Sequence, residues 1–481
     1  MATSTRSYFV FLVLLSLISF GGHFTRSSLS MFGLYLINDG TISPAGLGVM
    51  LAACSLPSIL IPLIVGHMID TTKKERMITL VLFGFTIGGL LLFNVAICSG
   101  VFWLSVFALV VYGSGASSVT VIQRILVTLY LKENITFTTG IYIAMANVAK
   151  LLGKISVGPT AAHLGSWQAA LVLPVLACVM SLLCYLVFLW LYGSGDGGTH
   201  EYWELDEELG SEANEAEALL HDAKGSNRSA NGRSYDSIDS VMGENMKQAC
   251  EDVPTASVYS SWTQLSCGFY WFAGLHSLYI MIFHSLVSFL PHYAYRKWGG
   301  TEIEIGFIAS IPHIVIIVAA PAMGAVVDRF GHRTAFCTVA AAMSVVAYAM
   351  LAYQEKANPY VTMTLMSVSQ GLIPALTLAQ ISRILPDDSV GVAFGIIEVL
   401  DSLVNVLGNV FFGGLYDLTG SYEVGMQVLL GLSVAGVFVF LFLLITDAAK
   451  ENVLPSPSRS TLRDSPLRVR PSRSVSPNPL R

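Results

Sequence analysis

Long apolar stretches alternate with short polar connections along most of the chain, and one long polar segment interrupts them. A membrane-spanning helix needs roughly 20 apolar residues, and twelve stretches reach that length. The pattern therefore predicts an all-α membrane protein with twelve transmembrane helices, arranged as two six-helix repeats. The twelve stretches cover residues 8–31, 44–68, 77–99, 101–130, 137–160 and 169–193, and then residues 266–293, 302–327, 334–354, 359–385, 390–415 and 424–446.

The first stretch resembles a signal peptide in its position but not in its pattern. Its apolar run continues through Phe20, Gly21 and Gly22 without an A-x-A cleavage signal, so we interpret it as a retained helix. Four regions are expected as a result. They are an N-terminal six-helix bundle over 1–194, an acidic disordered cytosolic loop over 195–262, a C-terminal six-helix bundle over 263–447, and a basic disordered cytosolic tail over 448–481.

Composition supports a membrane protein, and the charge is concentrated in one segment. Only 12% of the residues are charged, against about a quarter in an average soluble protein, which excludes a soluble multidomain enzyme. Residues 195–262 hold 15 acidic and four basic side chains, although the whole chain carries a net charge of only −6. The acidic balance therefore describes one loop, and it implies no nucleic-acid partner.

Basic residues in the short connections predict the orientation in the membrane. Lys73, Lys74 and Arg76 follow the second stretch, Arg329 and Arg333 follow the eighth, and further arginines lie in the tail. Because cytosolic connections collect Lys and Arg, these connections and both termini are expected in the cytosol. The two N-glycosylation sequons, at Asn134 and Asn227, fall on the same side and are expected to stay unmodified.

The two halves of the chain repeat each other at a nearly constant offset. Four residues in and just after the fifth stretch recur 255 residues later in and just after the eleventh, and Thr120 and Gln123 recur 257 residues later as Thr377 and Gln380. Such parallel repeats are typical of transporters. The four matched pairs are Gly140 with Gly395, Gly153 with Gly408, Gly165 with Gly420, and Ser166 with Ser421.

A short motif after the second and eighth stretches resembles the loop motif of the major facilitator superfamily, G-x-x-x-D-R-x-G-R-[RK]. The copy from Gly324 to Arg333 matches it almost position for position, whereas the first copy has Lys73 in place of the glycine. The resemblance implies a major facilitator fold and a gating role for these residues on the cytosolic face. An aspartate there can accept hydrogen bonds from helix amides and pair with arginine. The gating residues are Gly66, Asp70 and Arg76 in the first copy, and Gly324, Asp328, Arg329, Gly331 and Arg333 in the second.

Further strings resemble the family of lysosomal dipeptide uniporters. They include Ile18–His23, Tyr112–Ser117 and Gly140–Asn147 in the first half and Gly413–Asp417 in the second. Two positions depart from that family: Asn147 stands in place of an arginine suited to a peptide carboxylate, and Ser117 in place of an acidic residue. Lys150 and Lys154 lie on the same helical face as Asn147 and are expected to supply the missing cation.

Ionisable side chains within the stretches are candidates for substrate binding, because a charge inside a membrane usually faces a cavity or a partner. Cations lie mainly in the first half and carboxylates in the second, a distribution that suits a zwitterion with its carboxylate toward Lys150 and its amine toward Glu398 or Asp401. The alternatives are pairs that only hold the two halves together, and arginines such as Arg26 that reach the headgroups. The predicted substrate-binding set is Lys150, Asn147, Lys154, Glu398, Asp401, His23, Arg124 and His276.

The acidic loop contains a sequence typical of endolysosomal sorting signals. Glu215, Leu219 and Leu220 fit the pattern [DE]-x-x-x-L-[LI], which clathrin adaptors read. The pattern also occurs by chance in short amphipathic helices. A clathrin adaptor is therefore one predicted partner, and a lysosomal or endosomal membrane is favoured over the plasma membrane.

The resemblance implies a secondary transporter that moves dipeptides or amino acids from the lysosome lumen to the cytosol by alternating access. Two alternatives remain: a sugar or monocarboxylate-like organic-anion facilitator at another membrane, and a receptor or scaffold of this fold that does not transport. No nucleophile elbow, phosphate loop or metal-ligand spacing stands out, so no enzyme activity, cofactor or metal is expected. The expected partners are a small-molecule substrate, the lipid bilayer and a glycosylated lysosomal membrane protein.

Overall fold

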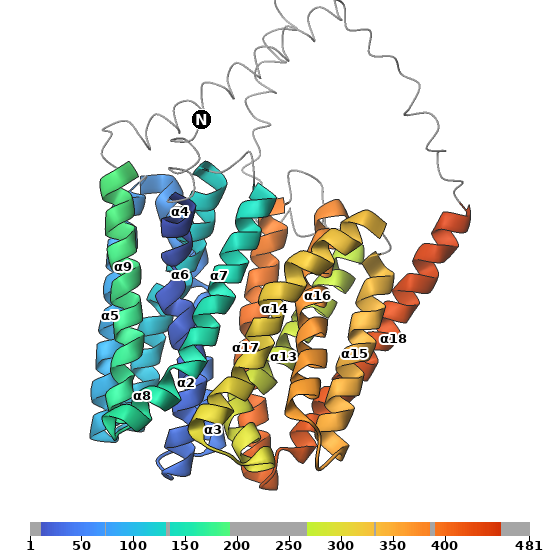
Figure 1. Ribbon diagram of the computed structural model, residues 1–481. Coiled ribbons are helices and arrows are strands. Elements are labelled where there is room, and N and C mark those ends of the chain that lie inside the picture. Colours follow the sequence, from blue (N-terminus) through green and yellow to red (C-terminus); the bar gives the residue numbers. More distant parts are fainter. Residues whose placement is uncertain are drawn as a thin grey trace, which may run out of the picture.

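The structure is a computed structural model of the whole chain, and it describes residues 11–72, 74–130, 135–192, 267–330, 333–384 and 390–453. These residues are nearly all helical, which confirms the predicted all-α class. Two groups of roughly parallel helices stand side by side (Figure 1). The predicted acidic loop over 195–262 and the tail beyond residue 453 lie outside the described residues.

The first group contains six helical stretches in the described part of the chain. Helical residues 11–17 lead into α2, and two other stretches are interrupted, one by a 3-10 turn at Pro57 and one at Ser156. Proline lacks the amide that an α-helix requires, which explains the first interruption. The elements are α2 (Phe20–Asn38), α3 (Pro44–Ser55), η1 (Leu56–Ile59), α4 (Ile61–Thr72), α5 (Glu75–Ser99), α6 (Phe102–Tyr130), α7 (Ile135–Ile155), α8 (Val157–Leu164), η3 (Gln168–Leu171) and α9 (Val172–Tyr192).

The second group contains six longer helices within the described residues. Two of them, α13 and α16, continue through an internal proline, Pro291 and Pro374 respectively. The elements are α13 (Cys267–Trp298), α14 (Glu302–Phe330), α15 (Arg333–Tyr353), α16 (Pro359–Ile384), α17 (Val390–Thr419) and α18 (Glu423–Val453).

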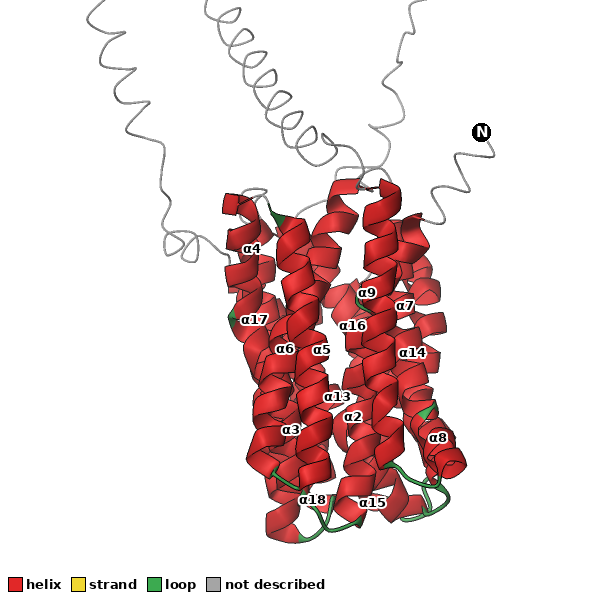
Figure 2. Ribbon diagram, turned by 90° about the vertical axis from the view of Figure 1, so that its left-hand side faces the viewer, coloured by secondary structure: helices red, strands yellow, loops and turns green. Residues whose placement is uncertain are grey.

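Eight helices of the described residues are long and apolar enough to cross a membrane. They are the stretches built on α5, α6, α9, α13, α15, α16, α17 and α18. The four remaining stretches begin at residues 11, 44, 135 and 302. Figure 2 shows that the long helices of both groups run along one common axis. The outer faces expose large apolar side chains such as Trp103, Trp190 and Phe438, as expected for surfaces that contact lipid.

The glycines matched between the halves occupy equivalent places. A Cβ at Gly153 of α7 would overlap the Phe24 carbonyl oxygen of α2, and a Cβ at Gly408 of α17 would lie 2.5 Å from Ser285 Oγ of α13. Each glycine therefore brings the fifth helix of its half against the first. Gly165 and Gly420 both end a stretch in the left-handed conformation, at φ of 69° and 73°, which glycine adopts without steric cost.

The two groups meet at the lower end of the molecule as drawn in Figure 1. There α3 packs on α17, so closely that a Cβ at Gly413 would overlap the Pro44 carbonyl oxygen. The Ala45 amide at the start of α3 donates a hydrogen bond to Asp417 Oδ1 across the two groups, at 3.2 Å. We call this lower end the closed end. The connections found there span residues 39–43, 100–101, 165–167, 299–301, 354–358 and 420–422.

A second contact between the groups joins α7 and α8 to α14. A Cβ at Gly306 of α14 would lie 3.1 Å from the Lys154 carbonyl oxygen, and a Cβ at Gly158 of α8 would lie 3.1 Å from the Glu302 carbonyl oxygen. Small residues thus allow backbone-to-backbone contact, which is how helices associate where the surroundings are apolar. Above these contacts the two groups leave space for a cavity.

Candidate functional site

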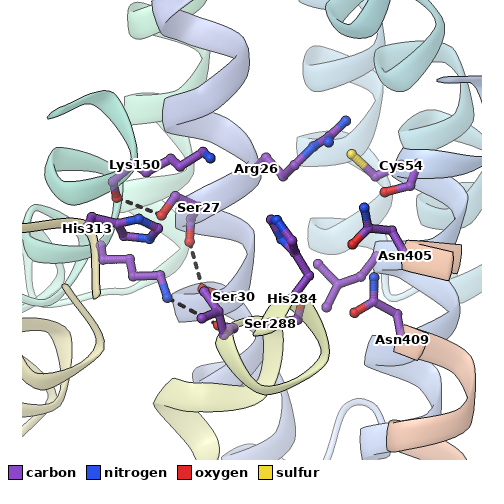
Figure 3. A pocket seen from close by; sticks show the side chains of 14 residues that line it. Arg26, Ser27, Ser30, Cys54, Lys150, His284, Ser288, His313, Asn405 and Asn409 are labelled. Carbon is purple, nitrogen blue, oxygen red and sulfur yellow. Dashed lines mark hydrogen bonds between the residues drawn. The ribbon is translucent and has the colours of Figure 1, made fainter. Parts of the chain in front are cut away.

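A cavity of about 60 Å³ lies between the two groups and is lined by residues from both. Figure 3 shows the lining side chains converging from α2, α3 and α7 of the first group and from α13, α14 and α17 of the second. The volume is far below the roughly 300 Å³ of a typical small-molecule site, so a solute larger than a few waters requires the groups to separate. The lining residues are Arg26, Ser27, Ser30, Leu51, Cys54, Ser55, Lys150, Lys154, His284, Val287, Ser288, His313, Asn405 and Asn409.

Arg26 and Lys150 form the cationic part of the cavity. In Figure 3 Lys150 extends from α7 and Arg26 from α2, and the Arg26 guanidinium points toward Cys54 of α3. The two helices are fixed to each other by the hydrogen bond from Ser27 Oγ to the Lys150 carbonyl oxygen, at 2.6 Å. Arg26 and Lys150 repel each other electrostatically. Among the described lining residues there is no Asp or Glu, whereas Arg26, Lys150 and Lys154 carry basic groups.

Lys154 lies one turn further along α7 and faces the second group. Its side chain is only 1% exposed, and its Nζ donates a hydrogen bond to the Val287 carbonyl oxygen of α13, at 3.2 Å. The contact links the two groups just above the closed end. Sequence spacing placed Lys150 and Lys154 on one helical face, but the structure gives their ammonium groups different surroundings.

Arg26, several serines, two histidines and two asparagines line the cavity although the predicted binding set did not contain them. His284 and His313 come from α13 and α14, and Asn405 and Asn409 lie one turn apart on α17. A sequence signal existed for the asparagines, because Asp401, Asn405 and Asn409 recur every four residues along one face of a helix. The histidines stand alone in apolar runs, and the sequence says little about where a lone histidine points.

The predicted carboxylates do not line this cavity. Asp401 accepts a hydrogen bond from Ser277 Oγ at 2.9 Å and lies 3.1 Å from His276 Nε2, within the second group. Glu398 interacts electrostatically with Arg26 of the first group. Asn147 is buried on α7, with its Oδ1 3.4 Å from His313 Nδ1. Amine recognition by Glu398 or Asp401 therefore stays a prediction.

His23 is on α2, one turn before Arg26, and is not among the described lining residues. Arg124 is on α6, and its side chain lies outside the described part of the structure. The two motif copies fall at corresponding junctions, α4 to α5 and α14 to α15, at the upper end in Figure 1. Their gating role stays a prediction. Of the motif residues, Gly66 and Asp70 lie on α4, Arg76 on α5, Gly324, Asp328 and Arg329 on α14, and Arg333 on α15; Gly331 and the sorting residues Glu215, Leu219 and Leu220 lie outside the described residues.

Comparisons with known proteins agree with this architecture. The lysosomal dipeptide transporter MFSD1 of Danio rerio is 22% identical over 85% of this chain and 80% of its own length. The MFSD1 of Homo sapiens is 21% identical over 92% of this chain and 87% of its own length. A POT family transporter crystallised in complex with 5-aminolevulinic acid superposes with a TM-score of 0.64, at 14% identity, over 92% of this chain and 96% of that chain.

The family assignment rests on a match that spans most of the sequence. The sequence profile described as Major Facilitator Superfamily matches residues 10–296, which include the first group and most of α13, and residues 272–479, which begin within α13 and include the rest of the second group. Together the two matches span both groups of helices. This multi-pass membrane protein belongs to the major facilitator superfamily of transporters.

Proposed function

We propose that this transporter carries dipeptides or amino acids from the lysosome lumen to the cytosol by alternating access, with the carboxylate of the solute held by Arg26 and Lys150. The observation that carries the proposal is the pair of cations facing one cavity between the two halves, without a lining carboxylate among the described residues. A carboxylate bound there relieves the repulsion between the two cations and gains charge-assisted hydrogen bonds.

The substrate class is supported by relatives whose names state lysosomal dipeptide transport. Their family usually has an arginine where this chain has Asn147. Arg26 on α2 and Lys150 on α7 supply positive charge in its place, close to that position. The polar amides of Asn405 and Asn409 on the opposite wall are suited to the peptide group or the amine.

The predicted orientation assigns the two ends of the molecule to the two sides of the membrane. With the basic connections in the cytosol, the closed end faces the lumen, and the structure corresponds to a lumen-closed state. The contacts of α3 with α17 and of α7 with α14 would then be the ones that open to admit lumenal solute. Localisation in the lysosomal membrane, a clathrin adaptor that reads Leu219 and Leu220, and a glycosylated membrane partner belong to the same proposal.

Flux into proteoliposomes tests the proposal directly. We expect labelled dipeptides to exchange across the membrane. Lys150→Gln and Arg26→Gln should each raise the dipeptide concentration that gives half-maximal flux by about tenfold or more, because a hydrogen bond to a charged group contributes about 1.5–3 kcal/mol. Lys356→Gln makes the same chemical change at an exposed position and should leave flux unchanged. Unaltered flux in both cavity variants would refute the assignment of these two cations, and no flux of any solute would favour a non-transporting receptor or scaffold.

An organic-anion facilitator is the second candidate, because the lining cations suit a monocarboxylate as well as a peptide. Blocked dipeptides separate the two candidates. A dipeptide transporter of this kind should not carry a dipeptide whose C-terminus is amidated, and it should carry a dipeptide with a free amine faster than an N-acetylated one. If N-acetylated dipeptides and simple monocarboxylates are carried at the same rate as free dipeptides, the organic-anion function is the correct one.

A further inference from the structure

A second cavity, of about 520 Å³, lies within the second group at the closed end. It is bounded by the ends of α13, α15 and α17 and by the start of α18, and we call it the outer cavity. The connections 299–301, 354–358 and 420–422 lie at this end in Figure 1, on the side that the predicted orientation assigns to the lumen. Its volume falls within the roughly 300–1,000 Å³ of small-molecule sites, unlike that of the cavity between the two groups.

Hydrogen bonds hold one wall of the outer cavity in place. The Leu351 carbonyl oxygen belongs to the last turn of α15, where a helix leaves its carbonyl groups without helical partners. It accepts hydrogen bonds from Tyr293 Oη at 3.1 Å and from Lys297 Nζ, both at the end of α13. Trp298 Nε1 donates to the Ala357 carbonyl oxygen at 2.8 Å. The end of α13 is therefore tied to α15 and to the connection that follows it.

The two halves of the chain differ at this place. In the first half, Trp167 Nε1 donates to Asp39 Oδ2 at 2.7 Å, and the indole stacks on Tyr35 with 6.0 Å between ring centroids. In the second half, Tyr422 has a smaller ring than an indole, and Lys297 bonds to α15 instead. The outer cavity is thus a departure from the repeat. The corresponding residues are Tyr35 and Tyr293, and Asp39 and Lys297, at the 258-residue offset of the two loop motifs, and Trp167 and Tyr422 at the 255-residue offset of the glycines.

Opposite charges line the outer cavity from different elements. Arg296 and Lys297 come from α13, Glu423 comes from α18, and Glu355 comes from the connection after α15. Glu423 attracts Lys297 electrostatically, yet none of these four side chains forms an ion pair with another residue in the described part of the chain. A ligand that carries both a positive and a negative charge can bridge the two sets.

The remaining lining adds an aromatic surface. The rings of Tyr416 and Tyr422 lie 4.4 Å apart between centroids, and Tyr422 Oη is held 2.7 Å from His292 Nδ1. Such rings bury the apolar part of a ligand and keep a polar group at one end. The outer cavity therefore combines sites for an amine, a carboxylate and an apolar side chain.

We propose that the outer cavity is a second dipeptide site, where a dipeptide from the lumen binds while the closed end is shut. Arg296 and Lys297 hold its carboxylate, and Glu423 and Glu355 hold its amine, through charge-assisted hydrogen bonds. Two extended residues span about 7 Å, so a dipeptide can reach between charges that do not touch each other. The proposal rests on the proposed function, from which it takes the lumenal side and the class of solute.

The position of the outer cavity suits the capture of solute before the closed end opens. The cavity between the two groups holds about 60 Å³ in this conformation, too little for a dipeptide, whereas the outer cavity is already large enough. Tyr416 lines the outer cavity and directly precedes Asp417, which accepts the hydrogen bond from the Ala45 amide across the closed end. A dipeptide bound there lies beside the contact that must separate.

Equilibrium binding of labelled alanyl-phenylalanine to the purified full-length protein tests the proposal. The intact protein should bind two dipeptides per chain. The double variant Arg26→Gln, Lys150→Gln lacks both cations of the cavity between the groups and should still bind one. In that background, Glu423→Gln and Arg296→Gln should each raise Kd about three- to fivefold, because both side chains are exposed and exposed charge pairs contribute modestly. Together they should raise Kd about tenfold or more.

Matched controls make the same chemical changes outside the outer cavity. Glu302→Gln and Lys356→Gln alter exposed residues of the closed end that do not line it, and both should leave Kd unchanged. Unlabelled alanyl-phenylalanine should compete with the labelled dipeptide, whereas its N-acetylated and C-amidated form should not. If the double variant Arg26→Gln, Lys150→Gln does not fold, the outer substitutions are made in the intact protein, where they should weaken one of two binding events.

The outcomes separate this site from the proposed function. One dipeptide per intact chain, or loss of all binding in a folded Arg26→Gln, Lys150→Gln variant, would refute the outer site and leave dipeptide transport in place where flux is seen. Binding that ignores Glu423→Gln and Arg296→Gln, or that the uncharged competitor abolishes, would refute it too. Binding that depends on these two residues in a protein without dipeptide flux would support the outer site and count against the transport function.

Discussion

Closure of the lower end depends on a glycine contact between α17 and α3, which a single methyl group should open. A Cβ at Gly413 would overlap the Pro44 carbonyl oxygen and lie 3.0 Å from its carbonyl carbon and 3.1 Å from Ala45 Cα. Both helices must then move apart, which also lengthens the bond from the Ala45 amide to Asp417. Adding a methyl group to a closely packed contact costs about 1–3 kcal/mol.

This cost falls only on the conformation in which α3 and α17 are in contact. Gly413→Ala should therefore shift the equilibrium away from the closed lower end by about 5- to 150-fold. Gly414→Ala is the matched control, because the next residue has no atom within 4 Å of an added Cβ. Replacing Gly by Ala favours the helix by at most about 1 kcal/mol, and this effect is the same in both variants. The difference between Gly413→Ala and Gly414→Ala therefore measures the effect of the contact with α3.

The assay is a distance measurement across the closed end. Spin labels at Thr41 and at Leu418 are on exposed positions of opposite halves, the second with 86% of its surface exposed. We expect a predominant short distance in the intact protein and in Gly414→Ala, and a larger population of long distances in Gly413→Ala. Identical distance distributions in all three proteins would refute the reasoning that this contact sets the closure.

Three further changes test other contacts. Lys154→Met keeps the length of the side chain but removes the hydrogen bond to the Val287 carbonyl oxygen. Because the donor is a charged group, closure should weaken by about 1.5–3 kcal/mol, seen as a rise of about tenfold or more in the population of long distances with the same spin labels; an unchanged distribution would mean that this bond does not hold the closed end. Gln123→Leu removes the 2.6 Å hydrogen bond from Gln123 Nε2 to the buried Leu15 carbonyl oxygen, which then keeps only the 3.4 Å bond from the Ile18 amide. Thermal unfolding should show a loss of about 1–3 kcal/mol, and an unchanged melting temperature would mean that the Ile18 amide satisfies this oxygen by itself. Trp167→Phe removes the 2.7 Å bond to Asp39 and keeps an aromatic ring at that position, so the loss should stay near 1 kcal/mol, and a loss above about 3 kcal/mol would show that packing dominates there.

Much of the fold could be predicted because lipid imposes a simple rule on the sequence. A spanning helix must satisfy its own backbone, so length and hydropathy alone locate most of the helices. The prediction was least accurate where helices contact each other. The first stretch was expected to end at residue 31 but continues to Asn38, and the second is broken at Pro57. Repeated glycines fixed the pairing of helices within each half, since close approach requires the same small residue in both copies.

The candidate site could be predicted only in part. Lys150 stood out as a charge in an apolar run, and its side chain does line the cavity. Asp401 stood out for the same reason, yet it contacts His276, which is 125 residues away in sequence. Both are ionisable groups within spans, and their sequence surroundings do not distinguish a residue that faces a cavity from one that faces a partner.

The sequence by itself determined that the chain is a membrane protein, which family it resembles, and that a few ionisable residues lie within apolar spans. These features are visible in the sequence because hydropathy and the spacing of small residues are local properties. Tertiary structure decided how those charges are divided. Arg26 and Lys150 face a shared cavity, Lys154 links the two halves, and Asp401 is paired with His276. That division depends on which helices pack together and on the rotation of each one about its axis. Both are set by contacts between residues more than a hundred positions apart, and no local pattern records them.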